Sequence, residues 1–297
     1  SSRPVEASSA PAAASSSDAA GLTLRPEGTA GVMRALMTSG LIQHLPQRLY
    51  YMGPMFRHER PQRGRFRQFH QFGVECVGTP HPYTDVESIC LAHAFLTEVL
   101  AGAGLRVTLQ INSLGDPASM AAYSRQLHDF CTAHAAHLSA DSVHRLERGA
   151  ALRILDSKSE ADQAVLAAAP PIAHSWSEDA ARRFDTVLQG LTALNIPFDI
   201  NPRLVRGLDY YRHTIFEFVA TQADAAGAAS GHVGTVLAGG RYDGLCAAFG
   251  GPKDVPAVGM LLLLLVSLRI TTHSAHLPFS ALRPPPRCTL LCRLGCG

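Results

Sequence analysis

An alanine-rich stretch with helical periodicity, residues 116–196, divides the chain between two groups of strand-like segments. These short segments lie on both sides of it, at residues 47–55, 66–77, 106–111, 198–205, 214–220 and 234–238. When strands come from both sides of a helical stretch, that stretch is most simply an insertion in a sheet domain. The pattern therefore predicts one sheet domain that carries a small inserted helical domain.

Two further segments, residues 29–41 and 85–101, have apolar residues at helical spacing and predict helices of the sheet domain. We expect five parts: a Ser/Ala-rich linker or insertion at 1–20, the core's first half at 21–114, the helical insertion at 115–197, the core's second half at 198–270, and a disordered tail at 271–297. The most apolar run, residues 261–266, is far shorter than the roughly 20 residues of a membrane span. This predicts a soluble protein with no membrane partner.

Charge and cysteine content exclude several functional classes. The 26 basic and 24 acidic residues leave a formal net charge of +2, too small for a chain built around nonspecific nucleic-acid affinity. None of the seven cysteines forms a CxxC pair, so neither a zinc site nor a secreted disulfide framework is indicated. We predict no metal-binding residues and a reducing compartment.

Arginine dominates the basic residues, because only Lys158 and Lys253 are lysines. Five arginines fall within eleven residues between the two strands of a predicted hairpin, at positions 57, 60, 63, 65 and 67, interleaved with phenylalanines. Guanidinium groups bind phosphate with paired hydrogen bonds, and aromatic rings stack on flat bases, so the segment suits a nucleoside polyphosphate. A solvated, charged edge strand that prevents aggregation is an equally good interpretation of the spacing alone.

Three other motifs carry candidate chemistry: TLRPEGTA at 23–30, RLVRGLDYYRHTIFEF at 203–218 and AGGRYDGL at 238–245. Each is also compatible with a purely structural turn. The paired glycines of the last motif permit close approach of a ligand to the backbone, but their spacing is not that of a Walker or dinucleotide loop.

Taken together and in this order, the four motifs closely resemble those of bacterial-type histidyl-tRNA synthetases. The resemblance runs from about Gly21 to Gly259 and includes NSLGD at 112–116 and LRILDSK at 152–158. It implies an α+β class II synthetase domain, with an antiparallel sheet flanked by helices. It also implies a ligase that condenses histidine with ATP, transfers the histidyl group to tRNA(His), uses Mg²⁺ and forms a homodimer in the cytoplasm or in a mitochondrion or plastid.

The resemblance assigns five residues to ATP. Arg57 and Arg206 would hold the α-phosphate as the catalytic charges, and Arg65 would reach the terminal phosphates. Glu59 would lie near the adenine amino group, and the ring of Phe69 would stack on adenine. Fixed cations suit this chemistry, because they neutralise the charge that develops when a carboxylate attacks a phosphate.

Six further residues are assigned to histidine by the same resemblance. Three match the group that binds the α-amino nitrogen: Glu27, Thr29 and Gln71. Glu75 and Tyr211 match the residues that bind the two imidazole nitrogens, and Tyr210 lines the same pocket. Partners for both ring nitrogens would disfavour an apolar substrate, because such a substrate leaves these groups unpaired.

The sequence departs from the family at both ends. The first class II motif, which supports the dimer interface, would lie before Gly21, where nothing resembles it. Val266 stands where the family has the arginine of the third motif, and no anticodon-binding domain follows. We therefore expect an incomplete ligase core without full activity. The alternatives are an inactive, histidine-binding paralogue like the regulatory subunit of ATP phosphoribosyltransferase, or an RNA-binding or assembly fragment.

Overall fold

The structure is a computed structural model that describes residues 23–58, 66–101, 103–205, 210–223 and 229–263. Its strands form one seven-stranded sheet: β1 (Gln47–Phe56), β2 (Gln68–Val77), β3 (Leu105–Ser113), β4 (Phe198–Ile200), β5 (Arg212–Ala223), β6 (Ala229–Arg241) and β7 (Ala257–Leu263). The spatial order is β1-β2-β7-β6-β5-β3-β4, and every neighbouring pair is antiparallel except β3 with β4. The predicted α+β class with a largely antiparallel sheet is confirmed.

Strands β1 and β2 form the predicted hairpin at one edge of the sheet, with Gln47 opposite Val77 and Phe56 opposite Gln68. Burial alternates along β2, as expected for a strand whose two faces meet different surroundings. The residues that join the two strands, 59–65, lie outside the described residues, and Glu59 and Arg65 lie among them.

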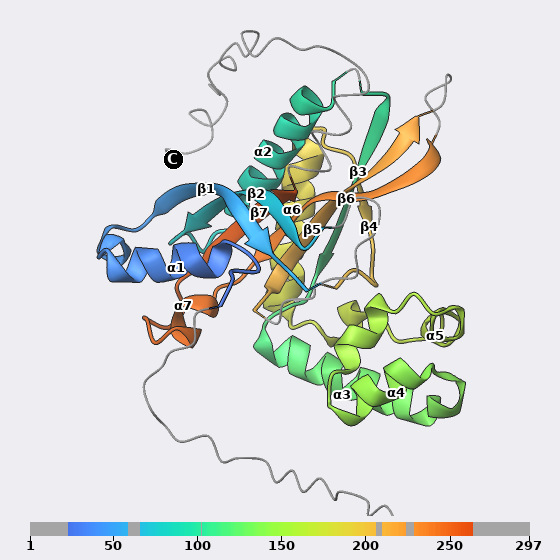
Figure 1. Ribbon diagram of the computed structural model, residues 1–297. Helices are drawn as coiled ribbons and strands as arrows, with labels where there is room; N and C mark the ends of the chain where they lie inside the picture. The colour runs from blue at the N-terminus through green and yellow to red at the C-terminus, as the bar shows by residue number, and fades with distance from the viewer. Residues whose placement is uncertain (1–22, 59–65, 102, 206–209, 224–228, 264–297) are drawn as a thin grey trace, which may run out of the picture.

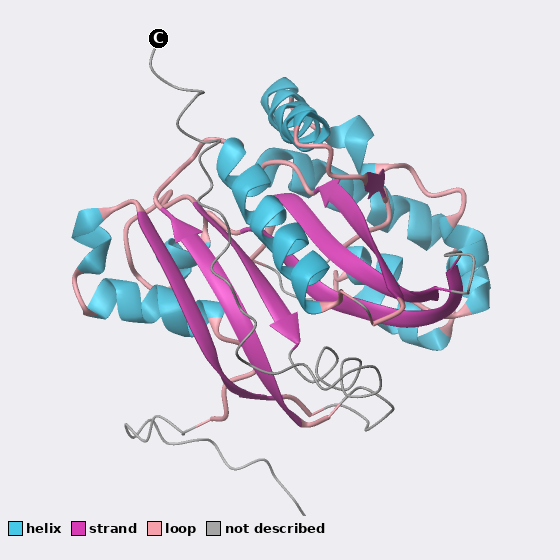
Figure 2. Cartoon of the chain, turned by 90° about the horizontal axis from the view of Figure 1, so that it is seen from above, coloured by secondary structure: helices cyan, strands magenta, loops and turns pink. Residues whose placement is uncertain are grey.

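Helices cover both faces of the sheet. On one face, α2 (Tyr83–Val99) and α6 (Glu178–Ala193) contact each other and pack on an apolar cluster that includes Phe216 and Phe218 of β5. On the other face lie α1 (Thr29–Thr38) and the short α7 (Leu245–Ala248) (Figure 1). Figure 2 shows the twist of the strands beneath the covering helices. No helix within the described ranges is both long enough and apolar enough to cross a membrane.

The helices between β3 and α6 form a unit beside the sheet: α3 (Pro117–Ala133), α4 (Ala140–Glu147) and α5 (Glu160–Leu166) (Figure 1). Asp116 caps α3 by accepting a hydrogen bond from the Ser119 N–H at 2.8 Å, and Pro117 occupies the first turn, where no N–H is needed. The Ser177 hydroxyl, at the start of α6, donates to the same carboxylate at 2.5 Å. Asp116 therefore joins the starts of α3 and α6 at the junction with the sheet.

The helical stretch of the sequence thus contains two kinds of helix. Leu127 of α3 and Leu166 of α5 belong to an apolar cluster that also includes Met33 of α1 and Leu245 of α7, whereas α6 packs on the other face of the sheet through Phe184, Val187 and Leu191. Strand β7 is a second difference, because the sequence analysis expects no strand at 257–263. The structure places this segment between β2 and β6, in the middle of the sheet.

Asp162 is the polar centre of the helical unit. Its buried carboxylate accepts hydrogen bonds from the Ser139 N–H at 2.6 Å and from three hydroxyls, those of Ser139, Ser142 and Ser157, at 2.5–2.7 Å. Burial alone would raise its pKa, but the hydrogen bonds outweigh burial and hold the pKa at about 2. These bonds connect the starts of α4 and α5.

We expect Asp162→Asn to destabilise the protein by about 2 kcal/mol at pH 7, because the backbone N–H of Ser139 and three hydroxyls lose an ionised acceptor. The folded pKa is below the value of about 3.9 found in unfolded chains, so the stabilisation is full above that pH and is lost as the pH falls toward 2. Urea unfolding at several pH values measures the difference. Asp141→Asn, at an exposed position of α4, is the control and should change stability by less than about 0.5 kcal/mol. An equal effect of both substitutions would contradict this role.

Candidate active site

The face of β2 that looks toward α1 carries the predicted site residues. Phe69, Gln71, Gly73 and Glu75 alternate on this face, and the exposed fractions of Gln71 and Glu75 are only 0% and 1%. Side chains two residues apart on a strand point to the same side, so the hairpin brings these polar groups into one row. The structure therefore buries an amide and a carboxyl group beneath the turn that begins α1.

The Glu75 carboxyl group is held from two sides by hydroxyls. Thr29 Oγ1, at the start of α1, donates to Glu75 Oε1 at 2.7 Å, and the Tyr242 hydroxyl donates to Oε2. Behind it, Gly259 of β7 leaves the necessary space, since a Cβ at that position would lie 1.6 Å from Oε2. Burial raises the Glu75 pKa to about 8, although the two hydroxyl hydrogen bonds act in the opposite direction.

Glu27 lies next to this group and caps α1. Its carboxylate accepts hydrogen bonds from the backbone N–H groups of Thr29 at 2.5 Å and Ala30 at 3.0 Å, and its side chain is buried. An ionised carboxylate has about four acceptor positions, so Glu27 can still accept from a ligand. Predicted residues Glu27, Thr29 and Glu75 thus meet at the start of one helix.

Four tyrosines surround the row. The Tyr242 ring contacts those of Tyr210 and Tyr211 edge-on, with centroids 5.7 and 6.5 Å apart. From β1, the ring of Tyr51 lies over Gly28 and Gly73, both of which have no space for a Cβ. The structure therefore brings predicted residues Tyr210 and Tyr211 to the same place as Glu75 and adds Tyr51 and Tyr242.

Several polar atoms in this region have no hydrogen-bond partner among the described residues. They include both side-chain polar atoms of Gln71. Buried polar groups are nearly always paired, and an unpaired one costs roughly 1–3 kcal/mol. Such atoms gathered beside a buried carboxyl group are typical of a site that completes its hydrogen bonds with a polar ligand.

Arg57 and Phe69 lie together at the end of the hairpin where the connecting segment joins β1 to β2. The Arg57 guanidinium is 4.9 Å from the centroid of the Phe69 ring, and its Nε donates to the Pro26 carbonyl oxygen at 2.9 Å. These two contacts orient the guanidinium beside the residues that are predicted to bind histidine. The two amino groups of the guanidinium are suited to binding a phosphate.

Not every arginine of the four motifs belongs to this region. Arg206, like Glu59 and Arg65, lies outside the described residues. Arg241, in the AGGRYDGL motif, is fully buried and bound to Asp85 and Asp243, so it is no phosphate ligand. Its position in the AGGRYDGL motif gives no sign of this, because the partner Asp85 is 156 residues away.

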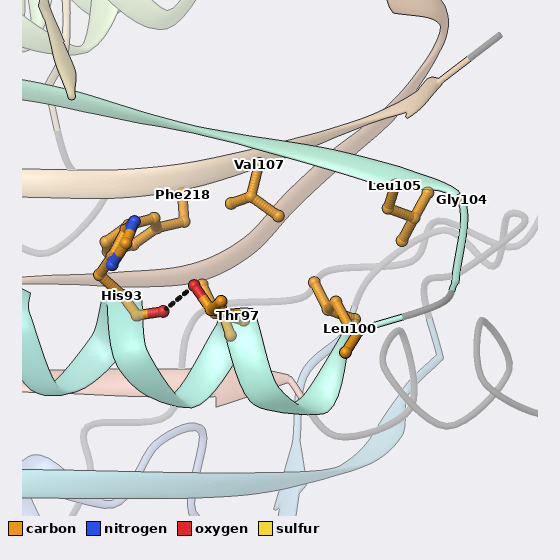
Figure 3. A pocket seen from close by; sticks show the side chains of 9 residues that line it. His93, Thr97, Leu100, Gly104, Leu105, Val107 and Phe218 are labelled. Atoms are coloured by element: carbon orange, nitrogen blue, oxygen red, sulfur yellow. Dashed lines mark hydrogen bonds between the residues drawn. The ribbon is translucent and has the colours of Figure 1, made fainter. Parts of the chain in front are cut away.

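A cavity of about 330 Å³ lies on the opposite face of the sheet, between α2 and strands β3 and β5. Figure 3 shows its lining, with the half-buried His93 beside Phe218 and mostly apolar side chains around them. It contains none of the predicted site residues. The candidate site is therefore the polar row beneath α1 and not this cavity.

Comparison with solved structures defines the class of protein. The crystal structure of apo S. aureus histidyl-tRNA synthetase matches with a TM-score of 0.63 and 31% sequence identity, covering 84% of this chain and 57% of that one. A Bacillus halodurans structure, described as an ATP phosphoribosyltransferase regulatory subunit/histidyl-tRNA synthetase, shares the fold with a TM-score of 0.55 at 21% identity, over 85% of this chain and 65% of that one. The antiparallel sheet with its edge hairpin is thus the catalytic-domain fold of a class II synthetase.

The sequence comparisons then give the family. The profile of histidyl-tRNA synthetase matches residues 15–264, so the chain belongs to the histidyl-tRNA synthetase family. The histidine–tRNA ligases of Rhodospirillum rubrum and Gluconobacter oxydans are 53% and 50% identical to it over 238 residues, which is 80% of this chain and 55% of each ligase. The chain therefore spans about half the length of these relatives.

We expect Gly259→Ala to destabilise the fold by about 2–3 kcal/mol, because the new methyl group would collide with Glu75 and with the backbone of Val74. Thermal and urea unfolding measure this effect. Gly31→Ala is the matched control: it lies in α1 with nothing within 4 Å of the added Cβ and should stabilise the protein by about 0.5 kcal/mol. If Gly259→Ala were as well tolerated as Gly31→Ala, this would contradict the conclusion that the Glu75 carboxyl group lies directly against β7.

Proposed function

We propose that this chain is the catalytic part of a histidine–tRNA ligase, which activates histidine with ATP and transfers the histidyl group to tRNA(His). In the first step a histidine carboxylate oxygen attacks the α-phosphorus, a P–O bond to the β-phosphate breaks and pyrophosphate leaves. In the second, a hydroxyl of the tRNA end attacks the histidyl carbonyl carbon and releases AMP. Membership of the family and identity near 50% to named histidine–tRNA ligases support this assignment.

The observation that carries the proposal is the buried and unpaired Gln71 amide, in line with Glu75. The α-ammonium group of an amino acid is a donor only, and the Gln71 carbonyl oxygen and the Glu27 carboxylate are acceptors that it could share. We infer that Glu27, Thr29 and Gln71 bind this group. Glu75 and Tyr211 would then bind the imidazole ring, and Tyr210 would line the same pocket.

For ATP, we propose that Arg57 and Arg206 neutralise the α-phosphate, Arg65 binds the terminal phosphates, and Glu59 and Phe69 hold the adenine. The position of Arg57 beside Phe69 and Pro26 supports a role at the junction of the histidine and nucleotide subsites. Mg²⁺ is expected as a companion of ATP and would neutralise part of the phosphate charge, because this ion is commonly bound through substrate phosphates and few protein ligands. Its ligands are not assigned, and the described residues contain no cluster of three metal-ligating side chains.

Other properties of the family remain predictions. They are the homodimer, the cytoplasmic or organellar location, and the division of the chain at residues 21, 115, 198 and 271. The contacts of α6 with the sheet favour an inserted helical domain that ends before Glu178.

Gln71→Met tests the role of the buried, unpaired Gln71 amide, because it keeps the volume of the side chain and removes its polar atoms. We expect stability to rise by about 1–2 kcal/mol, since an unpaired buried amide is lost. Histidine affinity, measured by calorimetry, should fall by about 10- to 100-fold, because the ammonium group loses an acceptor. Gln68→Met, at an exposed position of the same strand, should change neither quantity. Reduced stability with unchanged affinity would contradict the proposal.

Histidine-dependent exchange between ATP and pyrophosphate separates the ligase from its alternatives. Exchange that Arg206→Ala abolishes would support the ligase, because the α-phosphate loses a fixed cation, a loss that costs roughly 100- to 1,000-fold in rate. Histidine binding without exchange would instead favour the regulatory paralogue. Binding of RNA without histidine or ATP dependence would favour the RNA-binding fragment.

A further inference from the structure

We propose that Arg203 is a positioning residue that couples the helical unit to the candidate histidine site. Its side chain binds Gln163 of α5, and its backbone belongs to the loop at 201–205, which leads from β4 toward Tyr210 and Tyr211. The inference rests on the proposed function, in which Tyr211 binds the imidazole ring and Tyr210 lines the pocket. The role of Arg203 depends on a contact between two parts of the chain and not on contact with a ligand.

One hydrogen bond joins the loop to the helical unit. Arg203 Nη1 donates to Gln163 Oε1 at 2.8 Å, across 40 positions of the sequence. Gln163 is itself oriented, because its Nε2 donates to the Ser157 carbonyl oxygen at 2.5 Å. The Ser157 hydroxyl in turn donates to the Asp162 carboxylate at 2.5 Å. The acceptor for Arg203 is therefore held by the polar network that connects the starts of α4 and α5.

The loop that carries Arg203 is fixed to strand β3. The Asn201 N–H donates to the Ile111 carbonyl oxygen at 3.0 Å, and the Asn201 side chain accepts from the Arg203 N–H, also at 3.0 Å. Buried Asn112 donates through Nδ2 to the Leu204 carbonyl oxygen at 3.1 Å. The backbone on both sides of the Arg203 side chain is thus bound to the sheet, and the guanidinium reaches α5 from a defined position.

The same region shares an apolar core with the helical unit. Leu204, which follows Arg203, and Tyr211 of the candidate site belong to one buried cluster with Leu127 of α3 and Leu166 of α5. Protein interiors are close-packed and transmit small displacements, so a shift of α5 would be passed on to the loop and to Tyr211. The hydrogen bond of Arg203 adds a directional link at the surface of this core.

Hydrogen–deuterium exchange of the 297-residue chain tests this coupling, because coupling between two sites is reciprocal. If the Arg203 contact favours histidine binding, histidine also stabilises the contact. We expect histidine to slow amide exchange in α5 by about threefold, although α5 contains none of the predicted site residues, and Arg203→Met to abolish this effect. Arg145→Met is the matched control, since Arg145 Nη1 binds the Arg153 carbonyl oxygen within the helical segment, and it should leave the effect unchanged.

Histidine affinity, measured by calorimetry, is the second readout. Arg203→Met and Gln163→Met should each lower it by about three- to fivefold, the effect of one lost hydrogen bond, and the double substitution should lower it no further. Arg203→Lys combined with Gln163→Glu replaces the hydrogen bond with an ion pair. This pair should recover part of the affinity that Arg203→Lys alone loses. A general loss of structure gives no such recovery, because a second substitution would then add to the damage.

The outcomes separate the coupling from the proposed function. Histidine binding by the wild-type protein without slower exchange in α5 would overturn the coupling and leave the proposed function standing. The same holds if the effect on α5 persists in Arg203→Met, or if the losses of affinity in the double Met variant are additive. A wild-type protein that binds no histidine would overturn the proposed function, and the coupling with it.

Discussion

The buried ion pair between Arg241 and Asp85 connects the parts of this fold that come from distant regions of the sequence. Both side chains are fully buried, and Asp85 also accepts a hydrogen bond from Thr214 at 2.8 Å. The pair therefore joins the first turn of α2 to the strands β5 and β6, and Asp243 extends the connection to β7. Removing two charges from water is costly, so such a pair adds little net stability, but breaking it would leave one buried charge unpaired. This penalty favours a single arrangement of the central strands.

The position of the candidate site follows from that arrangement. Because β6 is fixed to α2 and β7, the turn at its end brings Tyr242 over Glu75 of β2, although the two residues are 167 positions apart. The same placement brings Gly259 behind the carboxyl group. The surroundings of Glu75 thus depend on contacts with α2, on the opposite side of the sheet.

The sequence predicts much of the fold because several elements have clear periodicity. Strands β1 and β2 alternate in burial, and α2 places Val86, Ile89 and Leu96 on one buried face. Strand β7 was missed because its apolar run has no alternation, and a short run of this kind does not distinguish a central strand from a buried helix. The place of α6 was also not predictable from its pattern, because an amphipathic helix packs equally well on a sheet or on other helices.

The site was predicted through its motifs, and the limits of that prediction are physical. Resemblance identified Glu27, Thr29, Gln71 and Glu75, which the structure brings together, but it did not reveal that Tyr242 binds Glu75 or that Tyr51 covers Gly73. These contacts cross the sheet, so no local spacing encodes them. Arg241 is the opposite case: it lies inside a conspicuous motif, yet it is buried in the core and does not face the candidate site.

The unpaired amide of Gln71 and the buried Glu75 affect the stability of the free protein and its ability to bind a ligand in opposite directions. Each reduces the stability of the free protein, since burial without full hydrogen bonding costs free energy. A ligand that supplies the missing hydrogen bonds recovers that free energy only when it carries donors and acceptors at the right positions. Under the proposed function, an apolar amino acid would fill the space but leave the groups unpaired, so the burial that weakens the free fold would also provide discrimination. If the proposed function holds, selectivity and stability are set by the same few side chains, and the buried contacts of Arg241 help to hold the strands that keep these side chains buried.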